Sequence, residues 1–179
     1  MTAPLYAIFP TSIGTCGILW SGRGILGVQL PESNETALRA RIVRRYPQAR
    51  AATPDTPTAA AITRITALLA GAHDDLGSLA LDYTGISEFE RDVYEAARRV
   101  GPGSVSSYGE LAARVGDRHA SRAIGQAMAR NPFPLIVPCH RILAADGGLG
   151  GFSARGGTST KQRLLEIEGA PVAVTLPLF

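Results

Sequence analysis

The sequence contains few of the residues that cross-link small proteins or bind metals. Only two of its 179 residues are cysteines, Cys16 and Cys139, and only three are histidines. Two distant thiols do not make a disulfide framework, and no cysteine and histidine spacing matches a zinc site. We therefore expect reduced thiols and no metal.

Long apolar stretches are also absent. No run reaches the roughly 18 apolar residues that a membrane span needs, and Met1 to Tyr6 show neither a basic region nor the apolar stretch of an export signal. With 45% hydrophobic residues, the chain is still apolar enough to bury a core. These features predict a globular cytoplasmic protein without a membrane partner.

Positive charge is concentrated in one part of the chain. The net charge is only +3, but residues 98–163 hold ten arginine or lysine residues against three acidic ones. Such an excess suits a polyanion such as nucleic acid, and it is equally typical of a solvated surface. Composition alone leaves both interpretations open.

The first half of the chain predicts a sheet with helices. Three short apolar runs are typical of β-strands: 5–9, 14–20 and 24–30. Residues 21–23 predict a hairpin between the second and third strands. Ser33 is suited to cap one helix and Pro57 to begin another, with a loop at 48–56 between them.

A change of pattern near residue 84 predicts a domain boundary. Before it, strands and helices are mixed, and beyond it helix start signals recur. We therefore predict an α+β fold. It would comprise a small N-terminal sheet-plus-helix domain at 1–84, a mostly helical domain at 85–170 and an apolar C-terminal tail at 171–179.

The first helix of the second domain is expected to begin with a capping box formed by Ser87 and Glu90. Four of its apolar residues are expected to face a core: Phe89, Val93, Ala97 and Val100.

Ser107 and Glu110 form a second capping box and begin a short helix that Gly116 ends. A further helix is expected from about residue 120 to residue 130. Two helices joined by a tight turn have the outline of a DNA-binding helix-turn-helix, and also of an ordinary helical hairpin.

The predicted helix at 120–130 is rich in small residues. Gly125 costs about 1 kcal/mol relative to alanine in a helix interior, and Ala123 and Ala127 lie on one stripe near it. Small side chains allow a close approach either to a nucleic-acid groove or to another helix.

The strongest chemical signal is the segment Pro138-Cys139-His140-Arg141, which places a thiol beside an imidazole and a fixed cation. Only the thiolate is nucleophilic, and a free thiol with a pKa of about 8.5 is only slightly ionised at neutral pH. A nearby cation and proton acceptor would increase that fraction. The motif therefore predicts a nucleophilic cysteine.

The C-terminal half resembles the O6-alkylguanine-DNA alkyltransferases. Four segments occur in that family's order and spacing: Ser106 to Leu111, Arg122 to Pro132, Pro138 to Arg141 and Leu164 to Gly169. The N-terminal half resembles the family's first domain, with its RNase H-like layout, only in the order of strands and helices, and it lacks the zinc-ligating residues of some members. The resemblance implies a DNA repair protein whose partner is double-stranded DNA containing alkylated guanine, and we expect a monomer.

The resemblance also implies a role for each catalytic residue. Cys139 would accept the alkyl group, and His140 would reach it through a water molecule, while Glu168 would hold the imidazole tautomer. Tyr108 would donate to the N3 edge of guanine, and Asn131 would brace the turn around the nucleophile. Without the resemblance, Glu168 is typical of a surface carboxylate and Tyr108 of a core residue.

A base inside a duplex cannot reach a pocketed thiol, so the nucleotide would have to be flipped out. Arg122 matches the family's intercalating arginine, with a plain phosphate contact as its alternative role. The small-residue helix would lie in the minor groove through Ala123, Gly125, Ala127 and Arg130.

The substrate pocket is expected to include Pro138, Ile142, Phe152, Ser153 and Lys161. The carbonyls of Cys139 and Ile142 match those that accept from the guanine amino group. Phe152 departs from the family, in which a tyrosine hydroxyl donates to the leaving oxygen, and the Ser153 N–H would remain as a donor. The loop at 154–157 is two residues longer than usual, which suggests a preference for adducts other than O6-methylguanine.

Alkyl transfer to sulfur would give a thioether that water does not cleave, so each molecule would act once and need no cofactor. Two rival functions are a lesion-binding signalling protein that transfers nothing and a turnover cysteine hydrolase. The presence of Cys139 favours transfer over binding, and the lack of a recognised oxyanion-hole motif disfavours hydrolysis.

Overall fold

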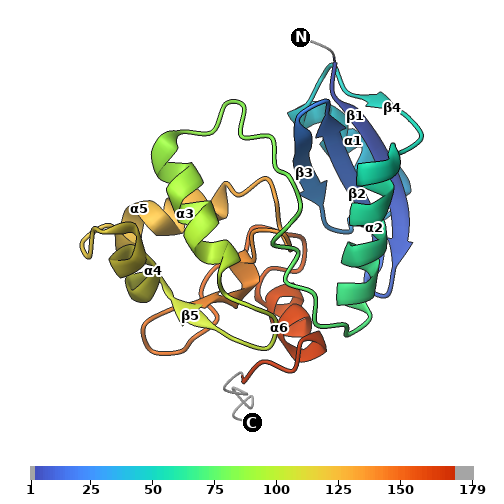
Figure 1. Ribbon diagram of the computed structural model, residues 1–179. Coiled ribbons are helices and arrows are strands. Elements are labelled where there is room, and N and C mark those ends of the chain that lie inside the picture. Colours follow the sequence, from blue (N-terminus) through green and yellow to red (C-terminus); the bar gives the residue numbers. More distant parts are fainter. Residues whose placement is uncertain (1–2, 172–179) are drawn as a thin grey trace.

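The computed structural model describes residues 3–171, so all but the first residue of the predicted tail lies outside the described chain. The N-terminal half is a four-stranded sheet in the order β3-β2-β1-β4 with one helix on each face (Figure 1). Its elements are β1 (Leu5–Thr11), β2 (Gly14–Ser21), β3 (Gly24–Gln29), α1 (Glu35–Arg45), β4 (Arg50–Ala51) and α2 (Thr56–Leu69).

Both faces of this sheet are buried, because alternate residues of a strand point to opposite faces. In β2, Ile18 and Trp20 belong to the cluster that includes Ile65 of α2. Leu19, between them, packs on the other face with Ile42 of α1. This two-sided burial explains why the strand is an unbroken apolar run in the sequence.

The helix starts of this half differ slightly from the prediction. Asn34 caps α1 in place of Ser33, and Asp55 caps α2, so that Pro57 is its second residue. Each cap side chain accepts from a backbone N–H of the first turn. The loop expected at 48–56 contains the short strand β4, which pairs in parallel with β1.

The C-terminal half is mostly helical, which confirms the predicted α+β class. Its elements are α3 (Glu88–Arg98), β5 (Ser106–Ser107), α4 (Tyr108–Val115), α5 (Ser121–Ala129), the 3₁₀ helix η1 (Cys139–Arg141), β6 (Ile142–Leu143) and α6 (Thr158–Ile167). No helix among residues 3–171 is long and apolar enough to cross a bilayer.

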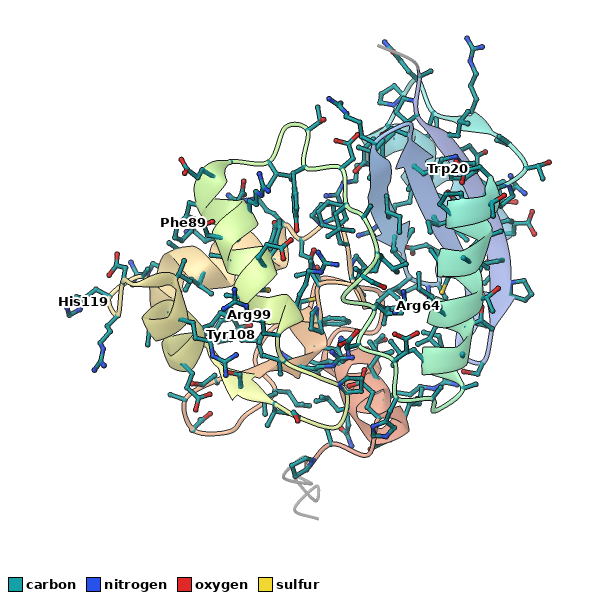
Figure 2. All side chains as sticks on the ribbon, in the orientation of Figure 1. Trp20, Arg64, Phe89, Arg99, Tyr108 and His119 are labelled. Atoms are coloured by element: carbon teal, nitrogen blue, oxygen red, sulfur yellow. The ribbon has the colours of Figure 1, made fainter. Side chains whose placement is uncertain are left out.

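Both predicted capping boxes are present. In each, the serine side chain accepts from the backbone N–H three residues later and the glutamate side chain accepts in return, for Ser87 with Glu90 and for Ser107 with Glu110. Gly116 ends α4 in the left-handed conformation at φ 89°. The turn that follows leads directly into α5, and Figure 2 shows His119 at its tip.

The prediction that Phe89 faces the core is wrong. Its side chain is 38% exposed in the first turn of α3 (Figure 2), whereas Val93, Ala97 and Val100 are buried. The apolar stripe of the helix therefore extends one turn beyond the surface that covers it.

The two halves share one hydrophobic cluster, which contains both Ile65 of α2 and Val93 of α3. They also meet along β3, where the Val28 N–H donates to the Pro132 carbonyl at 2.9 Å. Gly27 permits this approach, because a Cβ there would lie 3.0 Å from the same carbonyl oxygen. The boundary at residue 84 stays a prediction.

Because the core is shared, we predict that the two halves unfold together. Ile65→Ala should lower the free energy of unfolding by about 2–5 kcal/mol, since it removes a fully buried side chain. Urea unfolding would be followed by the fluorescence of Trp20, the single tryptophan, and by far-ultraviolet circular dichroism. Thr63→Ala, at an exposed site of the same helix, is the control. Two separate midpoints would show independent domains.

Candidate active site

Cys139 follows a tightly fixed turn. Asn131 spans that turn, because its Nδ2 donates to the Val137 carbonyl and its Oδ1 accepts from the Phe133 N–H, both at 2.8 Å. Leu135, within the turn, has a φ of 76°, which is costly for a residue with a side chain. The backbone that presents the thiol is therefore held by specific contacts.

Cys139 lines a cavity of about 290 Å³. The residues that line it come from α4, α5, η1 and the loop before α6: Tyr108, Met128, Ala129, Cys139, Gly151, Phe152 and Ser153. Its volume is close to the lower limit of small-molecule sites, about 300 Å³. Cys139 is only 8% exposed, but it forms part of the wall of this cavity.

A larger cavity, of about 590 Å³, lies between the loop that precedes α1 and the first half of α6. It does not reach Cys139. We assign the site to the smaller cavity because the nucleophile lies there.

Behind the thiol, three buried polar side chains form one network. His140 Nε2 lies 2.8 Å from Glu168 Oε1. Arg141 donates from Nε to Glu168 Oε2 and from Nη2 to Oε1, both at 2.8 Å, and from Nη1 to the Val100 carbonyl at 2.6 Å. The side chains of His140, Arg141 and Glu168 are at most 3% exposed. Glu168 is therefore buried and fully paired, not a surface carboxylate.

This network fixes two protonation states. Burial disfavours charge on Glu168, but the hydrogen bonds from His140 and Arg141 outweigh it and lower the pKa of Glu168 to about 2. Burial also lowers the pKa of His140, so its ring is neutral at neutral pH. With Nε2–H donating to the carboxylate, Nδ1 carries the lone pair. Nδ1 is buried and has no hydrogen-bond partner within residues 3–171.

Lys161 does not line the cavity. Its side chain is fully buried, Nζ donates to the Ile142 carbonyl at 2.6 Å, and burial lowers the pKa of the amine to about 8. Burial raises the pKa of the Cys139 thiol, and Asn131 and Lys161 offset part of this effect. The resting thiol is therefore protonated.

The predicted pocket residues separate into two groups. Phe152 and Ser153 line the cavity, whereas Pro138, Ile142 and Lys161 are buried outside its wall. The Ile142 carbonyl already accepts from Lys161, although a carbonyl oxygen has a second lone pair for another donor.

Tyr108 is the first residue of α4 (Figure 2) and shares the cavity with Cys139. Burial raises the pKa of its hydroxyl, and the nearby thiol adds to the effect. The hydroxyl therefore keeps its proton at neutral pH and can donate.

The outer face of α5 differs from the predicted stripe. Arg122 and Ala123 are exposed, and a Cβ built on Gly125 would meet nothing within 4 Å. Ala127, however, is fully buried, and its carbonyl accepts from the Tyr94 hydroxyl at 3.0 Å. The prediction that Ala127 contacts DNA is therefore wrong, because the helix turns that position toward the core.

Arg130, at the end of α5, is exposed but engaged. Its guanidinium pairs with Glu90 at 3.1 Å, and its own carbonyl accepts from Arg45 of α1 at 3.3 Å. A DNA contact by Arg130 would compete with the Glu90 pair.

Sequence reasoning missed three residues of the cavity wall, Met128, Ala129 and Gly151. It identified Arg141 as a fixed cation beside the thiol and the imidazole, but not as the residue that holds Glu168. Nothing in the local pattern indicated a partner 27 residues away.

Comparison with known proteins identifies the family. Residues 88–170 match the family model described as 6-O-methylguanine DNA methyltransferase, DNA binding domain. A methylated-DNA–protein-cysteine methyltransferase from Methanothermobacter thermautotrophicus is 33% identical over 153 residues, which cover 86% of this chain and 78% of that protein. The chain belongs to this family.

Other methyltransferases of the family agree. The methylated-DNA–protein-cysteine methyltransferase of Mycobacterium leprae is 40% identical over 121 residues, covering 68% of this chain and 71% of that protein. The crystal structure of Mycobacterium tuberculosis OGT in complex with DNA has a TM-score of 0.74 and 29% identity, covering 93% of this chain and 95% of that one. The predicted family and enzyme class, a methylated-DNA–protein-cysteine S-methyltransferase, are confirmed.

Glu168→Gln should destabilise this methyltransferase by about 3–5 kcal/mol, because Arg141 would stay buried without a charge partner. The folded-state pKa of Glu168, about 2, lies below its ordinary value of 4.5. The carboxylate therefore stabilises the fold above pH 4.5, and this contribution is lost as the pH falls toward 2.

Urea unfolding at about pH 7 and about pH 3 measures this contribution. The difference between the two pH values should be smaller in Glu168→Gln than in the unmodified protein. Glu166→Gln, at an exposed position of the same helix, should keep the full difference. An undiminished difference in the Glu168 variant would show that the carboxylate does not carry the effect.

Proposed function

We propose that this protein repairs double-stranded DNA by transferring an alkyl group from O6 of guanine to Cys139. The observation that carries the proposal is a cysteine in the wall of a cavity, followed in the sequence by a histidine whose free ring nitrogen can accept a proton. Family membership supports it. A cytoplasmic monomer without a cofactor is the expected form.

The first step is removal of the thiol proton. His140 Nδ1 accepts the Cys139 proton through a bridging water molecule, and Glu168 stabilises the imidazolium that results. The protonation states at rest suit this role, because the thiol still holds its proton and the imidazole is neutral and can accept it.

The second step is displacement at carbon. The thiolate attacks the alkyl carbon as the carbon–oxygen bond breaks, and the electron pair of that bond passes to guanine. The Tyr108 hydroxyl donates to ring N3 and stabilises the developing charge. The side chain of Phe152 has no donor for the leaving oxygen, so the backbone N–H of Ser153 donates a hydrogen bond to that oxygen instead.

Entry of the base requires extrusion from the duplex. Arg122 projects from α5 at an exposed position and would fill the gap that the base leaves. Because Ala123 and Gly125 are small, α5 can approach the minor groove closely, in a helix-turn-helix arrangement with α4.

The product is a thioether, which has no route back to a free thiol. Each molecule therefore acts once, and the protein is consumed in proportion to the damage.

A lesion-binding protein without transfer is the second candidate. The observation in its favour is Phe152, which lines the cavity where the family has a donor hydroxyl. A transferase for adducts other than O6-methylguanine would explain the same residue, together with the longer loop at 154–157.

Intact mass after incubation with a duplex containing O6-methylguanine separates these functions. We expect the protein to gain one methyl group, located by peptide mapping at Cys139. Cys139→Ser should abolish the gain and keep DNA binding, while Cys16→Ser, at the other buried thiol, should leave it unchanged. Tight lesion binding with unchanged mass would support the second candidate, and clearance of excess substrate would indicate a hydrolase.

Arg122→Ala should slow transfer from duplex DNA about tenfold or more, equivalent to roughly 1.4 kcal/mol, because unstacking of the base is no longer compensated. Its reaction with free O6-methylguanine should be nearly unchanged. Arg118→Ala, at an exposed site in the preceding turn, is the control. An equal loss on both substrates would contradict a flipping role.

A further inference from the structure

Arg141 makes contacts that the proton relay itself does not require. Its guanidinium is fully buried and has three acceptors: both oxygens of Glu168 and the Val100 carbonyl. The two bonds to Glu168 form a bidentate pair, which fixes the plane of a carboxylate as well as its charge. Arg141 therefore orients the carboxylate that also pairs with His140.

Glu168 Oε1 is shared between two donors. It accepts from His140 Nε2 and from Arg141 Nη2, each at 2.8 Å. A lone carboxylate beside an imidazole favours the imidazolium, and a fixed guanidinium on the same carboxylate opposes this. Arg141 thus acts on His140 through Glu168 as well as directly.

Three charged groups face His140. Lys161 belongs to α6, Glu168 lies at the C-terminal end of this helix, and Arg141 belongs to η1. Two of the three are cations, so the surroundings do not favour a third positive charge. If Arg141 lost its charge, one cation and one anion would remain, and Glu168 would favour the imidazolium more strongly.

We propose that Arg141 is a positioning residue that acts together with burial to keep His140 neutral at rest, by neutralising and orienting Glu168. This inference rests on the proposed function, in which His140 accepts the Cys139 proton. An imidazolium has no lone pair for that proton, so the relay requires the neutral ring. Arg141 thereby sets the pH range in which the thiol is activated.

Histidine titration in the unmodified protein is the first test. The chain has only three histidines; His73 and His119 are exposed, and His140 is buried. In NMR spectra recorded from about pH 8 to about pH 5, His140 should become protonated below its ordinary value of 6.5. Protonation of His140 above that value would overturn the proposal.

Variants of Arg141 provide the second test, with the rate of thioether formation at Cys139 as readout. Arg141→Gln removes the charge and should move the acid limb of the pH dependence upward by about one pH unit or more. Arg141→Lys restores a charge without the bidentate geometry, so it should return the limb toward the original pH at a lower rate. A uniform loss at every pH, without a shift, would show a structural role only.

The matched control is Arg98→Gln. Arg98 is a largely buried arginine of α3 that donates to the Gly77 and Leu79 carbonyls and does not contact His140. Its loss should lower thermal stability and leave the pH dependence in place.

The two proposals fail in different ways. If the unmodified protein forms no thioether, the proposed function is wrong, whereas a thioether with an unshifted Arg141→Gln profile refutes only the role of Arg141. If Arg141→Gln does not fold, the titration of His140 in Arg141→Lys decides the question: a midpoint above that of the unmodified protein supports the proposal, because an ammonium does not reproduce the bidentate pair with Glu168, and an unchanged midpoint refutes it.

Discussion

The arrangement of the site depends on one buried carboxylate. Glu168 ends α6, and it binds two neighbouring residues of η1, His140 and Arg141, through three hydrogen bonds. Arg141 also donates a hydrogen bond to the carbonyl of Val100, just beyond the end of α3. Three segments that are distant in sequence are thus held together by one charge. A buried carboxylate is costly unless it is fully paired, so loss of any partner affects the whole network.

The N-terminal half takes part in the same construction. The Val28 N–H of β3 donates to the Pro132 carbonyl, next to Asn131, whose side chain spans the turn before the nucleophile. Arg45 of α1 donates to the carbonyl of Arg130 on the other side of Asn131. The first half therefore packs against the turn that sets the position of the thiol.

Local patterns predicted the local structure well. The strands of the hairpin, both capping boxes and the glycine that ends α4 follow from short-range spacing and backbone preference. Tertiary packing decided the rest. Phe89 continues the apolar stripe of α3 but lies outside the part of the stripe that is buried. Ala127 faces the core, where its carbonyl accepts from the Tyr94 hydroxyl. The pairing of Arg141 with Glu168 is equally non-local, so only the resemblance to a family brought Glu168 into the site.

The only lysine of the chain, Lys161, is fully buried. Every side-chain cation on the surface with a fixed charge is therefore a guanidinium, which does not titrate in the range where proteins are folded. At the centre of the molecule, by contrast, burial lowers the pKa of the Lys161 amine to about 8 and also lowers the pKa of the His140 imidazole. Attraction of these guanidinium groups to a phosphate backbone would therefore stay constant over a pH range in which the charge of the buried groups changes.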